Sequence, residues 1–122
     1  MSALASEVLE RLREPGTARF SPQNFATLLD LPQQELATLA RVHRNTMRTH
    51  PESPKLQEAL RVLARVLSAV MEIQPDLLRA IYFMKNEPIA AFQHMTLLRL
   101  VEQGRADDAV AYLESIASGF VG

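Results

Sequence analysis

The sequence contains no cysteine and no tryptophan, and only four of its 122 residues are glycine. Without cysteine there is no disulfide framework, no thiolate metal site and no cysteine nucleophile. So few glycines leave no glycine-rich loop that could hold phosphate groups. The chain also lacks an apolar run of the ~20 residues needed to cross a bilayer, and its first residues lack the layout of a signal peptide. These absences favour a cytoplasmic protein without a membrane segment.

The polar residues show no catalytic or metal-binding arrangement either. His43 and His50 are seven residues apart, so within one helix their Cα atoms would be separated by about 10 Å, too far to share a metal ion. Asp107 and Asp108 are adjacent, and on a helix they would point apart instead of acting as an acid–base pair. We therefore expect no enzyme, no metal site and no cofactor.

Charge is distributed unevenly along a chain whose net charge is only −1. Residues 41–65 carry six cations and two anions, a local charge of +4, whereas residues 99–122 carry two cations and four anions, a local charge of −2. A basic middle region beside an acidic C-terminal region suggests two binding surfaces with different partners. The 48% share of hydrophobic residues excludes an intrinsically disordered chain.

Hydrophobic periodicity predicts an all-α fold, because apolar residues recur at helical spacing and no segment alternates for long enough to form a strand. Ser21-Pro22 and Ser53-Pro54 each place a serine cap before a proline in the first helical position. Gly104 is predicted to end a helix that Thr96 begins. We expect an N-terminal helix-turn-helix bundle over residues 1–53, a long helix over residues 54–74 and a small C-terminal helical domain over residues 75–122.

The long helix is apolar on two of its three faces. Its first apolar stripe steps by four and three residues and consists of Leu56, Leu60, Leu63, Leu67 and Val70. Its second apolar stripe consists of Val62, Val66, Ala69 and Ile73. Such a helix must be packed between partners. Either the two ends of the chain enclose it as an internal spine, or a second subunit covers one stripe in a homodimer, and the two arrangements can coexist.

Residues 33–48 read as two short helices that meet at a sharp corner. Leu36, Leu39 and Ala40 share one helical face, and Val42 and Met47 can fill the angle between the helices. The polar side chains left over can donate to phosphates or read base edges. This pattern is typical of a helix-turn-helix, although similar helix pairs occur in proteins that bind no DNA.

The C-terminal half carries an ordered series of motifs. Residues 80–88 form an aromatic segment that ends in Asn-Glu-Pro, residues 96–105 read Thr-Leu-Leu-Arg-Leu-Val-Glu-Gln-Gly-Arg, and residues 112–119 end in a glycine. This series resembles the toxin-binding domain of the Xre/MbcA/ParS antitoxin family, and the N-terminal half resembles the Xre-like helix-turn-helix that precedes it. The resemblance covers about residues 20–122. Phe83 departs from it where the family often has Trp, and Arg41 stands where helix-turn-helix corners often have Gly.

The resemblance implies an antitoxin that neutralises a RES-domain toxin, an enzyme that consumes NAD, by binding at its active-site cleft. It also implies binding to double-stranded operator DNA and regulation of the antitoxin's own operon. The DNA-facing residues that it implies are Gln33, Gln34, His43, Arg44, Asn45, Thr46 and Arg48. The toxin-facing residues that it implies are Gly104, Arg105, Tyr112, Glu114, Ser118, Gly119, Phe120, Val121 and Gly122. The alternatives are a stand-alone helix-turn-helix regulator without a toxin and a helical adaptor that does not bind DNA.

Several apolar residues near the C-terminus could serve either the core or a partner. Phe120 and Val121 follow a helix-ending glycine and are expected to plug a cleft on another protein, unless Phe120 folds back on its own core. Tyr82, Phe83 and Phe92 are expected to be core residues. The buried face of the last helix is expected to consist of Val110, Leu113, Ile116 and Ala117.

Overall fold

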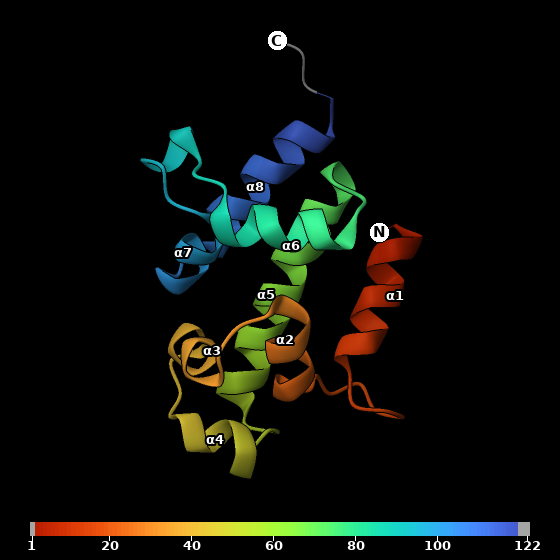
Figure 1. The fold of residues 1–122 in the computed structure, drawn as a ribbon, viewed down its shortest axis with the longest axis vertical. Helices are drawn as coiled ribbons and strands as arrows, with labels where there is room; N and C mark the ends of the chain where they lie inside the picture. Colours follow the sequence, from red (N-terminus) through yellow and green to blue (C-terminus); the bar gives the residue numbers. More distant parts are fainter. Residues whose placement is uncertain (1, 120–122) are drawn as a thin grey trace.

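The computed structural model describes residues 2–119. Within that range eight α-helices and one short 3-10 helix form the fold, and no β-strand is present (Figure 1). The elements are α1 (Ala3–Leu12), α2 (Pro22–Leu29), α3 (Gln33–Ala40), α4 (Arg44–Thr49), α5 (Pro54–Ile73), α6 (Leu77–Asn86), η1 (Ala90–Phe92), α7 (Leu97–Glu102) and α8 (Ala106–Ala117). The all-α prediction is confirmed. None of the helices in residues 2–119 combines the length and apolar character needed to span a bilayer.

Helix boundaries follow the capping residues that the sequence offers. The Ser21 side chain accepts a hydrogen bond from the Asn24 N–H at the start of α2, and Pro22 follows it. Thr96 caps α7 by accepting from the Arg99 N–H. Each bond satisfies a backbone donor that has no partner within the helix. Ser53 also stands at a cap position, before α5, but its side chain makes no capping hydrogen bond.

Helix α5 lies at the centre of the fold, and α1, α3, α6, α7 and α8 all pack against it. Its buried residues are Leu56, Gln57, Leu60, Leu63, Ala64, Val66, Leu67, Val70 and Met71. They include the whole first apolar stripe and Val66 from the second, whereas Val62, Ala69 and Ile73 are half-buried. The chain's own helices therefore enclose most of α5, in the arrangement of an internal spine.

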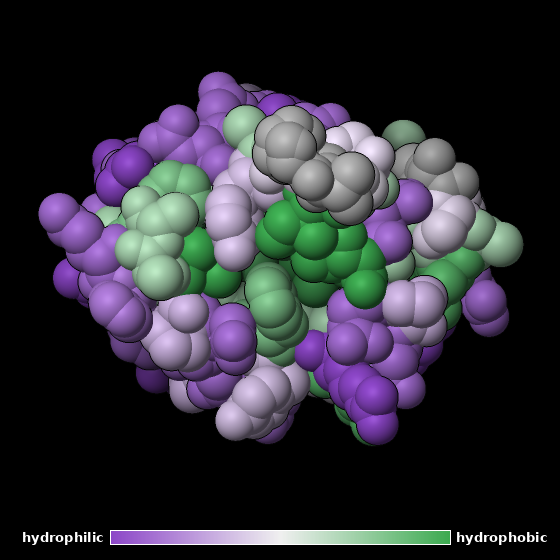
Figure 2. All heavy atoms as spheres, turned by 90° about the horizontal axis from the view of Figure 1, so that it is seen from above, coloured by the Kyte–Doolittle hydropathy of each residue, from purple (hydrophilic) through white to green (hydrophobic). Residues whose placement is uncertain are grey.

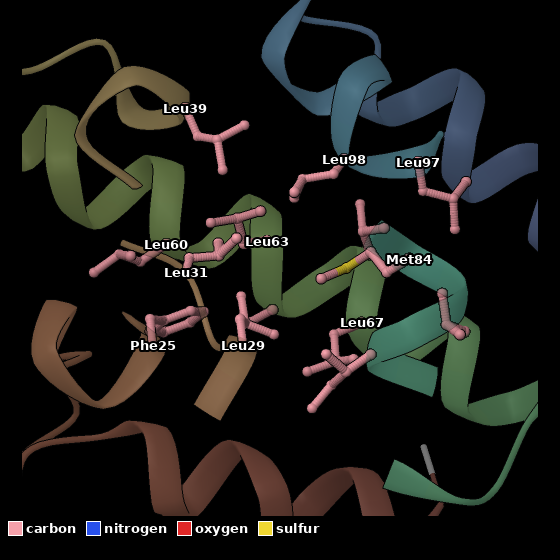
Figure 3. Packing of buried hydrophobic residues seen from close by; sticks show 14 of the residues in the cluster. Phe25, Leu29, Leu31, Leu39, Leu60, Leu63, Leu67, Met84, Leu97 and Leu98 are labelled. Carbon is pink, nitrogen blue, oxygen red and sulfur yellow. The ribbon is translucent and has the colours of Figure 1, made fainter. Parts of the chain in front are cut away.

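One hydrophobic cluster runs through both ends of the chain (Figure 3). Leu29 from α2 and Met84 from α6 approach each other beside Leu63 and Leu67 of α5, and all four are at most 1% exposed. Removing a large side chain from such a site typically costs about 2–5 kcal/mol of unfolding free energy. The N-terminal and C-terminal helices are thus held by shared packing.

Gln57 is the one buried polar or charged side chain among residues 2–119. Its Nε2 donates to the carbonyls of Phe20 and Pro51, each at 2.8 Å, and its Oε1 accepts from the Phe20 N–H at 3.0 Å. Buried polar groups are tolerated when their hydrogen bonds are made, as they are here. Gln57 therefore fixes the segment before α2 and the segment before α5 to the central helix.

Two cationic side chains connect the N-terminal half of the chain to the C-terminal half, one donating from each half to the other. Lys85 of α6 donates to the carbonyls of Leu29 and Asp30 at the end of α2, at 2.9 and 2.8 Å. Arg41, after α3, donates through Nη2 to the carbonyl of Glu102 at the end of α7, at 3.1 Å. Each cation thus meets a helix C-terminus, where free carbonyls and the helix dipole favour positive charge.

Two expectations about apolar residues are wrong. Tyr82 is 67% exposed and not a core residue, whereas Phe83 and Phe92 are partly buried against the core. The buried face of α8 ends at Leu113, because Ile116 is 43% exposed and Ala117 is also exposed. Both errors have one cause: helical spacing identifies an apolar face but does not tell how far along the helix a neighbour covers it.

We predict that Gln57→Leu lowers the free energy of unfolding by about 3 kcal/mol, because it removes three hydrogen bonds and leaves the Phe20 N–H and carbonyl without partners. Urea denaturation followed by circular dichroism measures this change. The matched control is Gln23→Leu at an exposed position of α2, which should change stability by less than ~0.5 kcal/mol. Equal stability of the two variants would contradict the role assigned to Gln57.

We also predict that Lys85→Met lowers the unfolding free energy by about 1–2 kcal/mol, because two charge-assisted hydrogen bonds to the end of α2 are lost. Lys55→Met is the control, since Lys55 is exposed and makes no hydrogen bond or ion pair within the described residues. Thermal unfolding of both variants tests the prediction. A Lys85→Met protein as stable as the control would show that this connection is not stabilising.

Candidate nucleic-acid and protein interfaces

The corner between α3 and α4 closes without a glycine. Arg41 adopts a left-handed conformation with φ of 56°, its N–H donates to the Thr38 carbonyl at 3.2 Å, and the Val42 N–H donates to the Ala37 carbonyl at 3.1 Å. This is the hydrogen-bond pattern of a Schellman motif, which usually has Gly at the left-handed position. Holding Arg there costs about 1 kcal/mol relative to Gly. The corner is therefore sharp and regular with Arg41 in place of the usual Gly.

Helix α4 is short and carries its polar residues on the outside. Met47 is buried against the rest of the fold and Thr46 is half-buried, whereas Arg44, Asn45 and Arg48 are exposed. The predicted outward orientation of these three side chains is therefore present. Arg44 and Arg48 are four residues apart, so they lie on the same helix face.

His43 has a structural task at the start of α4. Its Nδ1 accepts a hydrogen bond from the Asn45 N–H at 3.2 Å and so acts as the helix cap. That acceptor role requires Nδ1 to be unprotonated, which leaves Nε2 as the ring nitrogen that a ligand could contact. The predicted DNA-facing role of His43 is thus restricted to one nitrogen.

A shallow hollow of about 280 Å³ brings together two predicted DNA-facing residues that are distant in sequence. Gln33, in the first turn of α3, and Arg48 of α4 both line it, next to the start of α2. Glu14 also lines the hollow, but its carboxylate is held by Arg19, with Nη2–Oε2 at 2.6 Å, and this hydrogen bond raises the pKa of Arg19. The anion is thereby partly neutralised. Gln34, also exposed, lies beside Gln33 but is not among the lining residues.

The basic region, residues 41–65, has fewer unpaired cations than its sequence suggests. Of its six cations, Arg61 pairs with Glu58 at 2.8 Å, Arg65 pairs with Asp107 of α8 at 2.6 Å, and Arg41 is bonded to α7. Exposed pairs of this kind add little stability, but they reduce the positive field that DNA would meet. Arg41, Arg44, Arg48 and Lys55 make no ion pair among the described residues, and of these four only Arg41 has its side chain held by a hydrogen bond.

Gly104 and Arg105 form the tight turn between α7 and α8. Gly104 has φ of 75°, its N–H donates to the Val101 carbonyl at 3.0 Å, and the Arg105 N–H donates to the Leu100 carbonyl at 2.8 Å. The predicted helix end at Gly104 is confirmed, and its positive φ explains the need for glycine. The turn lies beside Arg41, so it adjoins the α3–α4 corner.

Arg105 and Tyr112, both expected to face a toxin, are engaged with the chain's own Phe92. The Arg105 guanidinium lies 5.3 Å from the centre of the Phe92 ring, and Tyr112 meets the same ring edge-to-face at 5.7 Å. Arg105 also donates to Asp108 at 3.0 Å. These contacts hold η1 against α8. A partner that used Arg105 and Tyr112 would have to share them with this cluster.

The remaining toxin-facing candidates lie at the other end of α8. Glu114, Ser118 and Gly119 are exposed, and we call these three residues the α8 end. A helix of twelve residues is about 18 Å long, so the α8 end and the turn at Gly104 cannot form one compact patch. The structure thus separates the predicted toxin-facing residues into two groups. Phe120, Val121 and Gly122 lie outside the described residues.

One exposed apolar site was not predicted from the sequence. Leu78 is 79% exposed and lies one turn before Tyr82 on α6. A signal was present, since α6 has apolar residues around most of its circumference and one neighbouring layer cannot cover them all.

Within residues 2–119, no three histidine or acidic side chains are grouped in a way that could hold a metal ion.

Comparison of the chain with family models, with curated proteins and with solved structures finds no match.

Proposed function

We propose that the chain is an antitoxin that binds a RES-domain, NAD-consuming toxin with its C-terminal region and operator DNA with its α3–α4 corner. The order and spacing of the sequence motifs support the antitoxin assignment. The observation that carries the proposal is the closed corner at Arg41, which projects Arg44, Asn45 and Arg48 from one short helix with no competing ion pair. The chain itself needs no cofactor and performs no catalysis in this scheme.

In the DNA complex, α4 enters the major groove and α3 lies across the backbone. Six helical residues extend about 9 Å, enough to face two or three base pairs. Arg44 and Arg48 contact phosphates or guanine edges, and Asn45 suits adenine. One corner offers few free cations, so binding to a palindromic operator by a homodimer would double the number of contacts and raise the affinity for DNA by far more than two-fold, because binding free energies add.

In the toxin complex, the α8 end is the first contact. It is exposed, it precedes the apolar residues Phe120 and Val121 in the chain, and within residues 2–119 its side chains have no hydrogen-bond or ion-pair partner on another helix. Insertion of this region at the mouth of the active-site cleft would exclude NAD. Gly104, Arg105 and Tyr112 form a second contact at most, because the last two already pack on Phe92.

A stand-alone transcription regulator is the second candidate, and the same corner supports it. The two candidates differ in what binds the C-terminal region. Co-purification of the chain with a RES-domain protein encoded by a neighbouring gene favours the antitoxin. DNA binding without such a partner favours the regulator.

We predict that Arg44→Ala and Asn45→Ala each weaken binding to the DNA upstream of the chain's own coding sequence about ten-fold or more. Arg44→Ala should also lower the salt dependence of binding by about one unit of slope if Arg44 contacts a phosphate. Fluorescence anisotropy at several salt concentrations measures both quantities.

Arg61→Ala is the control for these variants, because Arg61 lies in the same basic region but pairs with Glu58. Its DNA affinity should equal that of the unmodified chain. If all three variants bind equally well, or if no binding occurs at low salt, the α3–α4 corner is not a DNA-binding site.

For the toxin, we predict that Glu114→Arg at the exposed α8 end weakens the complex at least ten-fold, because it reverses a charge within a desolvated contact. Glu7→Arg on α1 makes the same charge change at an exposed position on another helix and should leave affinity unchanged. Calorimetry with the purified toxin and growth of co-expressing cells are the two readouts. Equal protection by both variants would place the toxin contact elsewhere.

A further inference from the structure

Helix α6 presents an apolar pair to solvent. In Figure 1 this helix crosses in front of α5, and no other helix lies over it in that view. Leu78 and Tyr82 are one turn apart, so they share a face, and they are the two most exposed large hydrophobic residues of the described chain. Single exposed apolar residues are ordinary, but two neighbours on one helix form a patch. Figure 2, which looks onto the molecule from above, shows hydrophobic residues gathered in the middle of that end of the surface.

The patch borders a groove of about 340 Å³. Its lining residues are Gln74, Leu78, Arg79, Tyr82, Phe83 and Glu87. Arg79 and Phe83 are four residues apart on α6. Glu87 follows the last residue of the helix and still donates its N–H to the Phe83 carbonyl at 3.1 Å, so the three residues form one row beside the row of Leu78 and Tyr82. The groove thus has apolar residues along its length, a cation toward one end and an anion toward the other.

The two charges are free to meet a partner. Arg79 and Glu87 make no ion pair with each other or with any described residue. They are eight residues apart, which corresponds to about 12 Å along the helix. Phe83 lies midway between them. A second α6 placed antiparallel across Phe83 would therefore bring each Arg79 opposite Glu87 of the partner copy.

We propose that this face of α6 is the contact between two copies of the chain. In this homodimer the two α6 helices cross antiparallel, Leu78 and Tyr82 of each copy cover apolar surface of the other, and two Arg79–Glu87 pairs form across the two-fold axis. Such an isologous contact requires a surface complementary to itself, and the arrangement of the groove meets that requirement. The contact lies on α6 and not on α5, whose apolar stripes are mostly covered within the chain. The proposal does not depend on the toxin or on DNA.

The size of the contact sets its strength. Leu78 and Tyr82 together offer on the order of 300 Å² per copy, well below the ~800 Å² per partner of a standard stable interface. Arg79, Phe83 and Glu87 extend the contact. Phe83 adds little area because it is already half-buried within the chain, whereas Arg79 and Glu87 are exposed. The dimer is therefore expected to be weak and concentration-dependent, with a dissociation constant in the micromolar range.

Sedimentation of the purified chain over a range of concentrations, without toxin or DNA, measures the dimerisation constant. Leu78→Gln and Tyr82→Gln should each weaken dimerisation at least ten-fold, and both positions are exposed, so the fold should persist. Ile116→Gln on α8 is the matched control, because Ile116 is an exposed large hydrophobic residue outside the groove. Its dimerisation constant should be unchanged.

A charge reversal tests the antiparallel geometry. Arg79→Glu alone and Glu87→Arg alone each place like charges opposite one another and should weaken the dimer several-fold. The double variant Arg79→Glu with Glu87→Arg restores opposite charges across the axis and should regain most of the dimerisation.

Three results would overturn the proposal. The first is a chain that sediments as a monomer at every concentration. The second is a dimer that is insensitive to the changes at Leu78 and Tyr82. The third is a Tyr82→Gln variant that dimerises as the unmodified chain does but loses toxin affinity, because this face of α6 would then be part of the surface that binds the toxin.

Discussion

The burial of α5 is the constraint on which the rest of the structure depends. A helix that is apolar on most of its circumference cannot be covered by one neighbour, so helices from both ends of the chain pack against it. The hydrophobic cluster is consequently continuous from α1 to α8. The hydrogen bonds of Gln57, Lys85 and Arg41 then fix segments whose positions apolar packing alone would leave undefined.

This arrangement places the two proposed binding surfaces at opposite ends of one body. In Figure 1, α4 lies at the bottom and the last turn of α8 at the top, with α5 between them. A toxin at the α8 end would leave the α3–α4 corner open, so both partners could bind one chain at once, as repression by a toxin–antitoxin complex requires. The Arg41–Glu102 hydrogen bond connects the corner directly to the C-terminal helices, because it joins the turn after α3 to the end of α7, against which α3 also packs.

Local patterns in the sequence predicted the helices and their ends well. Ser21, Thr96 and Gly104 act as expected because capping depends on a few adjacent residues. Long-range features could not be read in the same way. The pairing of Arg65 with Asp107 joins residues 42 positions apart and reduces the basic field, and the exposure of Tyr82 depends on which helix faces α6. For the binding surfaces, the sequence located the outward residues of α4. The resemblance to the antitoxin family grouped Gly104 with the α8 end, from which the length of α8 separates it.

Amide hydrogen exchange of the chain alone, with the toxin and with operator DNA tests the central claim most directly. The account predicts that the toxin slows exchange in residues 112–119 and leaves residues 33–48 unchanged, while DNA slows exchange in residues 33–48. Protection of residues 33–48 by the toxin, with no effect at residues 112–119, would contradict the assignment of the two surfaces.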